Sequence, residues 1–134
     1  GYTNIKRVAK PSVTVSARGT IGYSEIRQEP FFPVVRLIVL VPDSKVVSLP
    51  FLYYITRSFQ FSNTGSSIPQ LTIPMIEKIK IKLPLSLREQ EAIVKKLDSL
   101  SEQTKKLESV YQQKMNDLEE LKKSVLRNAF TGKI

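Results

Sequence analysis

The chain has 134 residues, enough for one ordinary domain, and its 21 lysines and arginines outnumber 12 acidic residues, giving a net charge of +9. It contains neither cysteine nor histidine. This excludes thiol nucleophiles, disulfides and imidazole chemistry, and we expect no catalytic and no metal site. The excess of positive charge favours an anionic partner, a nucleic acid or an acidic membrane surface, over a basic protein without a charged partner.

Membrane insertion is not indicated by the sequence. The longest apolar run, VVRLIVLV (34–41), contains Arg36 and is far shorter than the roughly 18 residues that a membrane span requires. The opening stretch GYTNIKRVAKP has no apolar core of the signal-peptide kind. We therefore expect a cytoplasmic protein with no membrane partner.

Residues 1–85 predict a small mixed domain that begins with strands. SVTVSA (12–17) alternates between polar and apolar residues, Arg18-Gly19-Thr20 predicts a turn, and TIGYSEI (20–26) predicts a returning strand. VVRLIVLV is apolar and rich in β-branched residues, which is typical of a central strand.

The second half of this domain predicts helices and one further strand. LPFLYYITRSFQF (49–61) repeats apolar residues at helical spacing, and NTGSS (63–67) predicts a loop. Thr72-Ile73-Pro74 is typical of a helix start with proline in the first turn. The alternating KIKIKL (78–83) predicts a strand.

Residues 86–134 predict one long helix. Ser86-Leu87-Arg88-Glu89 has the pattern of a capping box, in which the serine accepts from the amide three residues on and the glutamate reaches back. Gly132 marks the end. A helix over residues 87–129 would be about 65 Å long at 1.5 Å per residue. An 85-residue domain with a radius of gyration near 12 Å is too small to cover it, so a helix folded back onto its own domain is disfavoured.

Apolar residues spaced alternately four and three apart form a stripe along this helix, which predicts a coiled coil. The stripe consists of Ile93, Leu97, Leu100, Thr104, Leu107, Tyr111, Lys114, Leu118, Leu121 and Val125. In a parallel pair Lys114 would face Lys114. In an antiparallel pair centred between Leu107 and Tyr111, Ile93 meets Val125 and Thr104 meets Lys114, so the two polar positions share one layer. We predict antiparallel pairing with a second copy or a related helix.

The fold class that follows is α+β. We expect residues 1–85 to form a small mixed globular domain, residues 86–131 to form the coiled-coil helix, and residues 132–134 to form a tail. Residues 1–85 hold 11 basic and 4 acidic side chains, against 10 and 8 in residues 86–134. The charge excess therefore lies in the first part, where we expect contacts with phosphate.

Three stretches together resemble one known family. The run IPQLTIPMIEKIKIKLPLSLREQEAIVKKLDSL, with its pattern Pro84, Glu89, Gln90 and Ile93, and the ending LKKSVLRNAFTGKI resemble the specificity subunit of type I restriction–modification enzymes. VSARGTIGY resembles the Arg-Gly-Thr-Ile-Gly turn of the target recognition domains in that family. The resemblance covers nearly the whole chain.

The resemblance implies a non-catalytic subunit that reads double-stranded DNA. Such subunits usually carry two recognition domains and two conserved helices in an antiparallel coiled coil, and each domain reads half of a split site. Modification subunits methylate adenine with S-adenosylmethionine, and restriction subunits translocate and cut DNA, so S-adenosylmethionine, ATP and magnesium are expected on partners only. This sequence would supply one recognition domain, residues 1–85, and one helix. Compared with the family's pattern, that domain is expected to be incomplete at its N-terminus, so the chain is expected to be a fragment, a half-subunit that dimerises, or part of a larger subunit.

Candidate DNA contacts are basic residues near predicted turns and short polar residues of one loop. They are Lys6, Arg7, Lys10, Arg18, Thr20, Arg27, Asn63, Ser66, Ser67 and Gln70. The alternating lysines of 78–83 are interpreted as a solvated face, and Tyr53 and Tyr54 as core residues. Two other functions stay open: a coiled-coil adaptor that binds protein only, and a basic nucleic-acid-binding protein without sequence preference.

Overall fold

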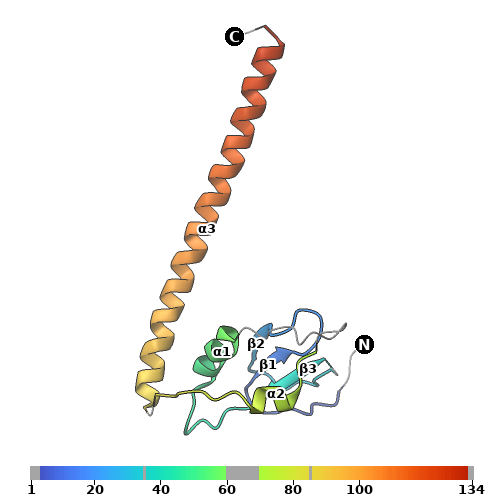
Figure 1. Cartoon of the computed structure of the whole chain (residues 1–134), viewed down its shortest axis with the longest axis vertical. Coiled ribbons are helices and arrows are strands. Elements are labelled where there is room, and N and C mark those ends of the chain that lie inside the picture. Colours follow the sequence, from blue (N-terminus) through green and yellow to red (C-terminus); the bar gives the residue numbers. More distant parts are fainter. Residues whose placement is uncertain (1–3, 35, 60–69, 85, 133–134) are drawn as a thin grey trace. The chain divides into compact units, whose positions relative to one another are not determined.

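The computed structural model describes residues 4–34, 36–59, 70–84 and 86–132. Three strands and three helices follow one another (Figure 1), and they confirm the α+β class. In chain order they are β1 (Ser12–Ser16), β2 (Ser24–Arg27), β3 (Leu37–Leu40), α1 (Leu49–Ser58), α2 (Ile73–Glu77) and α3 (Leu87–Phe130). The chain divides into two compact units, Gly1–Val94 and Lys95–Ile134, which we call the head unit and the helical unit.

The head unit is built on an antiparallel sheet with the order β2-β1-β3. Val13 of β1 lies opposite Ile26 of β2 and Leu40 of β3. The prediction that VVRLIVLV forms a central strand is wrong, because β1 occupies the centre and β3 lies at an edge of the sheet in the described residues. β1 is buried on both faces although three of its five residues bear a hydroxyl, whereas every residue of β3 is only half-buried.

The core lies on one face of this sheet. Val13, Val15 and Ala17 are buried there together with Leu71, whose backbone N–H donates to the carbonyl of Ala17. Side chains from α1 and α2 pack against this cluster. For α1 this agrees with the helical spacing of apolar residues in LPFLYYITRSFQF. Both helices begin as expected, with proline at the first or second position.

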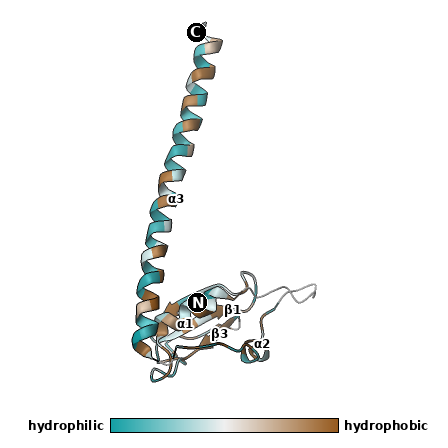
Figure 2. Cartoon of the chain, turned by 60° about the vertical axis from the view of Figure 1, so that its left-hand side comes forward, coloured by the Kyte–Doolittle hydropathy of each residue, from teal (hydrophilic) through white to brown (hydrophobic). Residues whose placement is uncertain are grey.

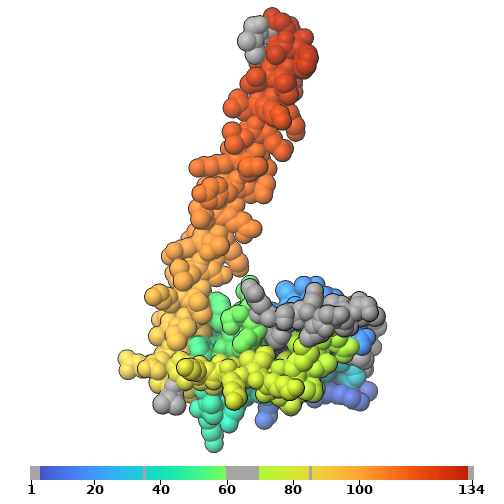
Figure 3. Space-filling model, viewed as in Figure 1, coloured from blue at the N-terminus to red at the C-terminus, as the bar shows by residue number. Residues whose placement is uncertain are grey.

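The segment after α2 is the second correction. KIKIKL forms no strand; residues 79–84 follow α2 without regular secondary structure. The alternation has another cause, because Ile79 and Ile81 line an apolar cavity of about 130 Å³ together with Leu52 and Ile55 of α1. The segment crosses the surface of the head unit between α2 and the start of α3 (Figure 3). Alternating side chains can therefore pack on a helix as well as on a sheet.

Helix α3 has 44 residues and confirms the predicted long helix. Its start differs in one detail: the Ser86 hydroxyl accepts from the backbone N–H of Arg88, 3.2 Å away, and not from that of Glu89, which donates to the Ser86 carbonyl. Gly132 follows the helix with φ of +67°, a conformation that favours glycine. None of the helices in the described parts of the chain is both long and apolar enough to cross a membrane.

Candidate nucleic-acid interface

The turn between β1 and β2 presents Arg18 to solvent. The backbone N–H of Ser16 donates to the carbonyl of Tyr23, and that of Gly22 donates to Ser16, which closes the turn. Gly19 has φ of +77° and open space around its Cα, so the backbone conformation and not crowding requires glycine there. Arg18, Gly19 and Thr20 are exposed. The predicted turn is confirmed.

The structure brings two predicted contact residues together from distant parts of the sequence. Nη2 of Arg18 donates to Oε1 of Gln70 at 2.8 Å, and both residues are exposed. The adjacent backbone bond between Leu71 and Ala17 holds the two segments side by side. A guanidinium has five N–H donors, of which this bond uses one. Arginine and glutamine are also the side chains that make bidentate contacts with guanine and adenine edges.

The cluster Lys6, Arg7 and Lys10 lies on the N-terminal segment and is exposed. Arg7 lies over the ring of Phe32, with its guanidinium carbon 5.3 Å from the ring centroid. The neighbouring residues Val8 and Phe31 exchange two backbone hydrogen bonds, which fixes the two segments side by side. A cation held over an aromatic face in this way keeps its charge at the surface.

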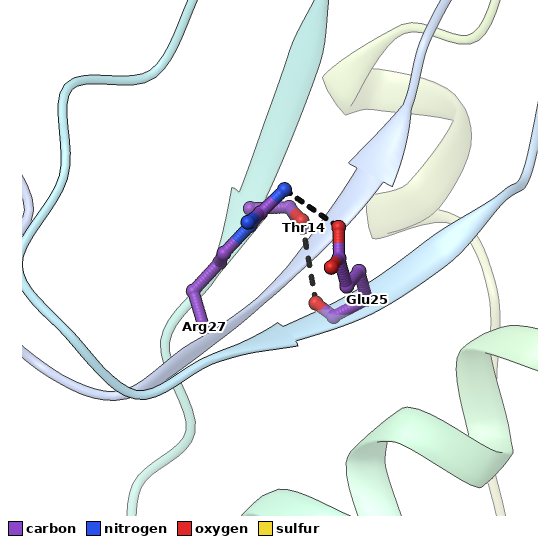
Figure 4. A network of polar contacts seen from close by, with 3 residues as sticks. All are labelled: Thr14, Glu25 and Arg27. Atoms are coloured by element: carbon purple, nitrogen blue, oxygen red, sulfur yellow. Dashed lines mark hydrogen bonds and ion pairs between the residues drawn. The ribbon is translucent and has the colours of Figure 1, made fainter.

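Arg27 is already engaged within the head unit. Its Nη2 donates to Oε2 of Glu25 at 2.6 Å, and the Thr14 hydroxyl donates to the backbone carbonyl of Glu25 (Figure 4). Both charged side chains are a little under half exposed, so the pair is a surface ion pair with a small effect on stability. Glu25 offsets the charge that Arg27 would present to a phosphate. The assignment of Arg27 to DNA stays a prediction.

The remaining predicted contacts, Asn63, Ser66 and Ser67, lie outside the described residues. Sequence reasoning missed Tyr23, which is 61% exposed directly after the Arg18 turn, and Phe32 beneath Arg7. Exposed aromatic rings beside basic residues are suited to stacking on bases. For Tyr23 the available signal was its position close after the predicted turn. Phe32 had no such signal, because its contact with Arg7 joins residues far apart in the sequence.

Helix α3 carries the second candidate surface. The stripe shows as brown bands along the helix in Figure 2, and its large apolar members from Leu100 to Val125 are between 49% and 61% exposed. Val110 and Met115 are also exposed and widen the stripe, each being adjacent in sequence to one of its members. Exposed apolar side chains repeated over this length form an apolar surface of the kind that helices of coiled coils carry.

The structure gives Gln90 of α3 a role that the sequence analysis did not predict. Gln90 is fully buried, and its side-chain amide hydrogen-bonds to backbone atoms of the head unit. Gln90 belongs to the family pattern Pro84, Glu89, Gln90 and Ile93. Nothing in the sequence around it predicts that its side chain is buried, because a polar residue of such a helix is normally exposed. The first turns of α3 therefore belong to the head unit.

The sequence of this chain is similar to those of known proteins. A family model described as the type I restriction modification DNA specificity domain matches residues 1–120. Three proteins of Mycoplasma pneumoniae, each named a putative type I specificity subunit, are 36% to 38% identical to this chain over 99 or 100 residues. The chain spans 27% and 29% of two of these relatives, and 67% of the third, whose name describes a C-terminus.

A solved structure has the same fold. The S subunit of a type I restriction-modification system from M. genitalium matches with a TM-score of 0.58 and 24% identity, over 81% of this chain and 30% of that one. The head unit, the long helix and the family match define a DNA specificity domain. This chain belongs to the type I restriction modification DNA specificity family.

Proposed function

We propose that this chain reads one half of a bipartite DNA site as part of a type I restriction–modification enzyme. The observation that supports the proposal is that the positive charge is concentrated in residues 1–85, whereas the exposed apolar stripe lies on α3. Of the net charge of +9, residues 1–85 contribute +7, and their exposed basic residues include Arg18, which is hydrogen-bonded to the neutral side chain of Gln70. Basic residues contact phosphates and position the protein, while paired arginine and glutamine side chains can reach base edges.

The helix supplies the second part of the proposal. We propose that α3 pairs antiparallel with a second copy or a related helix and so holds two reading heads at a fixed separation. The support is the register of the stripe, in which Ile93 meets Val125, Leu100 meets Leu118, and the polar residues Thr104 and Lys114 fall in one layer. The exposure of the stripe is consistent with a missing partner helix.

The chemistry is proposed to reside in partner subunits. Modification subunits with S-adenosylmethionine and restriction subunits with ATP and magnesium would dock on the paired helices and methylate or cut the DNA. This chain would act as the non-catalytic specificity subunit, because it lacks both thiol and imidazole groups and its relatives are named specificity subunits.

A binding selection tests DNA reading directly. The full chain, alone and with its modification subunits, is incubated with a pool of randomised duplexes, and enriched duplexes are compared with scrambled versions over a salt series. We expect the enriched duplexes to bind more tightly than the scrambled ones. With six phosphate contacts, log affinity would fall against log salt with a slope of about −5.

Arg18→Ala should lower the affinity, and if Arg18 contacts a phosphate the salt slope should become shallower by about one. The matched control is Lys105→Ala, which removes the same charge from an exposed position of the helical unit and should leave both quantities unchanged. Equal affinity for all duplexes would support a binder without sequence preference. Absence of binding in every condition would support the protein adaptor.

A further inference from the structure

Gln90 is the one residue of α3 that is buried among the described residues, with 0% of its surface exposed. Its neighbours Arg88, Glu89 and Glu91 are all exposed. A buried polar side chain on an otherwise exposed helix loses its water and must be compensated by the protein. Gln90 therefore marks a specific attachment between the start of α3 and the rest of the head unit.

The amide of Gln90 is compensated by three hydrogen bonds. The backbone N–H of Ser48 donates to Oε1 at 2.9 Å, and Nε2 donates to the carbonyls of Val46 at 2.9 Å and of Pro84 at 3.2 Å. The amide thus uses both of its N–H donors and one of the two lone pairs of its carbonyl oxygen, so neither of its polar atoms is left without a partner. The bonds connect α3 to the segment preceding α1 and to the segment preceding α3 itself.

The position of Gln90 continues the spacing of the stripe. It lies three residues before Ile93, and the next step, to Leu97, is four. Gln90 and Ile93 therefore lie on the same face of the helix. The helix face that is fastened to the head at Gln90 is the face that carries the pairing surface one turn later.

We propose that Gln90 is a positioning residue that sets the rotation of the reading head about α3. The inference rests on the proposed function, because the rotation of each head relative to the pairing stripe decides whether both heads face the same side of one DNA duplex. A buried amide is suited to this task because its donors and acceptor are satisfied in one arrangement only. A purely apolar contact tolerates sliding and rotation, since it has no directional requirement.

Three substitutions separate positioning from packing. Gln90→Leu keeps the volume and removes the hydrogen bonds, and Gln90→Ala removes both. Gln90→Glu keeps the shape but places an acceptor against the carbonyls of Val46 and Pro84, which accept from Nε2 in the native chain. The matched control is Gln103→Ala, at an exposed position of the same helix.

The rotation is measured as a distance within one chain. Because the chain contains no cysteine, spin labels can be attached specifically at Lys78→Cys in the head unit and Lys105→Cys in the helical unit. Mixing with an excess of unlabelled chain ensures that only distances within one copy are recorded, by double electron–electron resonance. Circular dichroism and the melting temperature confirm that each variant is folded at the temperature of preparation.

We expect a narrow distance distribution for the native chain and for Gln103→Ala. All three Gln90 variants should broaden it by a factor of about two or more, because the supporting contacts of the joint are lost. A broad distribution in the native chain, or an unchanged width in folded Gln90→Leu, would overturn the proposal, and broadening in Gln90→Ala alone would show that only the packed volume matters. Neither outcome depends on DNA binding. An unpaired α3 could lose helix and broaden the distribution by itself, so the width is compared only in samples in which circular dichroism shows α3 to be helical, and failure of the joint is then distinguishable from failure of the proposed function.

Discussion

The two units of the chain bury their apolar residues in different ways. The head unit encloses Val13, Val15 and Leu71 in a core of its own. In the helical unit the large apolar side chains stay exposed, up to 88% for Phe130. A region with its own core can fold alone, whereas a single amphipathic helix gains most of its stability from packing against a partner. The contrast shows that the head unit has an apolar core of its own, whereas the apolar stripe of the helical unit stays exposed, as the proposed pairing requires.

The variant with the largest expected effect disrupts the stripe on α3 and so tests whether its exposed apolar side chains mediate the proposed pairing. Leu100→Lys together with Leu118→Lys places charges in layers that face each other in the proposed pair. Truncating a buried leucine costs about 2–5 kcal/mol and each 1.4 kcal/mol is tenfold, so the dissociation constant should rise at least about a thousandfold. Analytical ultracentrifugation should show monomers, and circular dichroism should show loss of helix.

The control for this variant is Ser99→Lys with Gln113→Lys, which adds the same charge at exposed positions outside the stripe. It should remain paired. Persistence of the dimer in the stripe variant, or dissociation of the control, would show that the stripe is not the pairing surface.

The second prediction concerns the core of the head. Leu71 is 2% exposed and packs with Val13, Val15 and Ala17. Leu71→Ala should lower the free energy of unfolding of the head by about 2–5 kcal/mol, through lost burial and the cavity that remains. Hydrogen–deuterium exchange should accelerate in peptides of β1 and β3 but not in peptides of the helical unit.

Ile73→Ala is the matched control, because Ile73 follows closely in the sequence and is 59% exposed. Ile73→Ala should lower the free energy of unfolding of the head unit by much less than Leu71→Ala does. If Leu71→Ala accelerated exchange equally along α3 up to its last turns, the two units would form one cooperative structure, contrary to the contrast drawn above.

Local signals in the sequence predicted most of the fold. The alternation of SVTVSA and the glycine turn after it predicted β1 and the returning strand β2, helical spacing predicted α1 and α3, and the proline after Ile73 predicted the start of α2. VVRLIVLV contains the predicted strand, β3, but at an edge of the sheet and not at its centre, and KIKIKL forms no strand. A strand needs a partner, and neither that partner nor the place in the sheet is encoded in the segment itself. Ile79 and Ile81 face the helix α1, and β1 takes the centre of the sheet.

The candidate sites were predictable to a lesser degree. The stripe could be read directly, because helical spacing places its members on one face. Arg18 and Gln70 were each predicted, but their hydrogen bond joins residues 52 positions apart and depends on tertiary structure. The burial of Gln90 had no local signal, since glutamine in a mixed helix is normally exposed.

The last prediction perturbs the molecule least. It tests whether two α3 helices pair in antiparallel or in parallel orientation. The native chain lacks cysteine, so Leu97→Cys and Leu121→Cys introduce single thiols at two positions of the stripe. When the two variants are mixed and treated with a short bifunctional thiol reagent, antiparallel pairing places Cys at 97 of one chain opposite Cys at 121 of the other. The product should then be the mixed dimer, identified by mass with one variant carrying a tag.

Each variant alone is the control. In the antiparallel pair, positions 97 and 121 lie 24 residues apart along the helix, or about 36 Å at 1.5 Å per residue, so neither variant should link to itself. A parallel pair would give the opposite result, with efficient self-linking of each variant at equal positions. That outcome would place both heads at the same end of the paired helices, and α3 could then no longer act as a spacer between two half-sites.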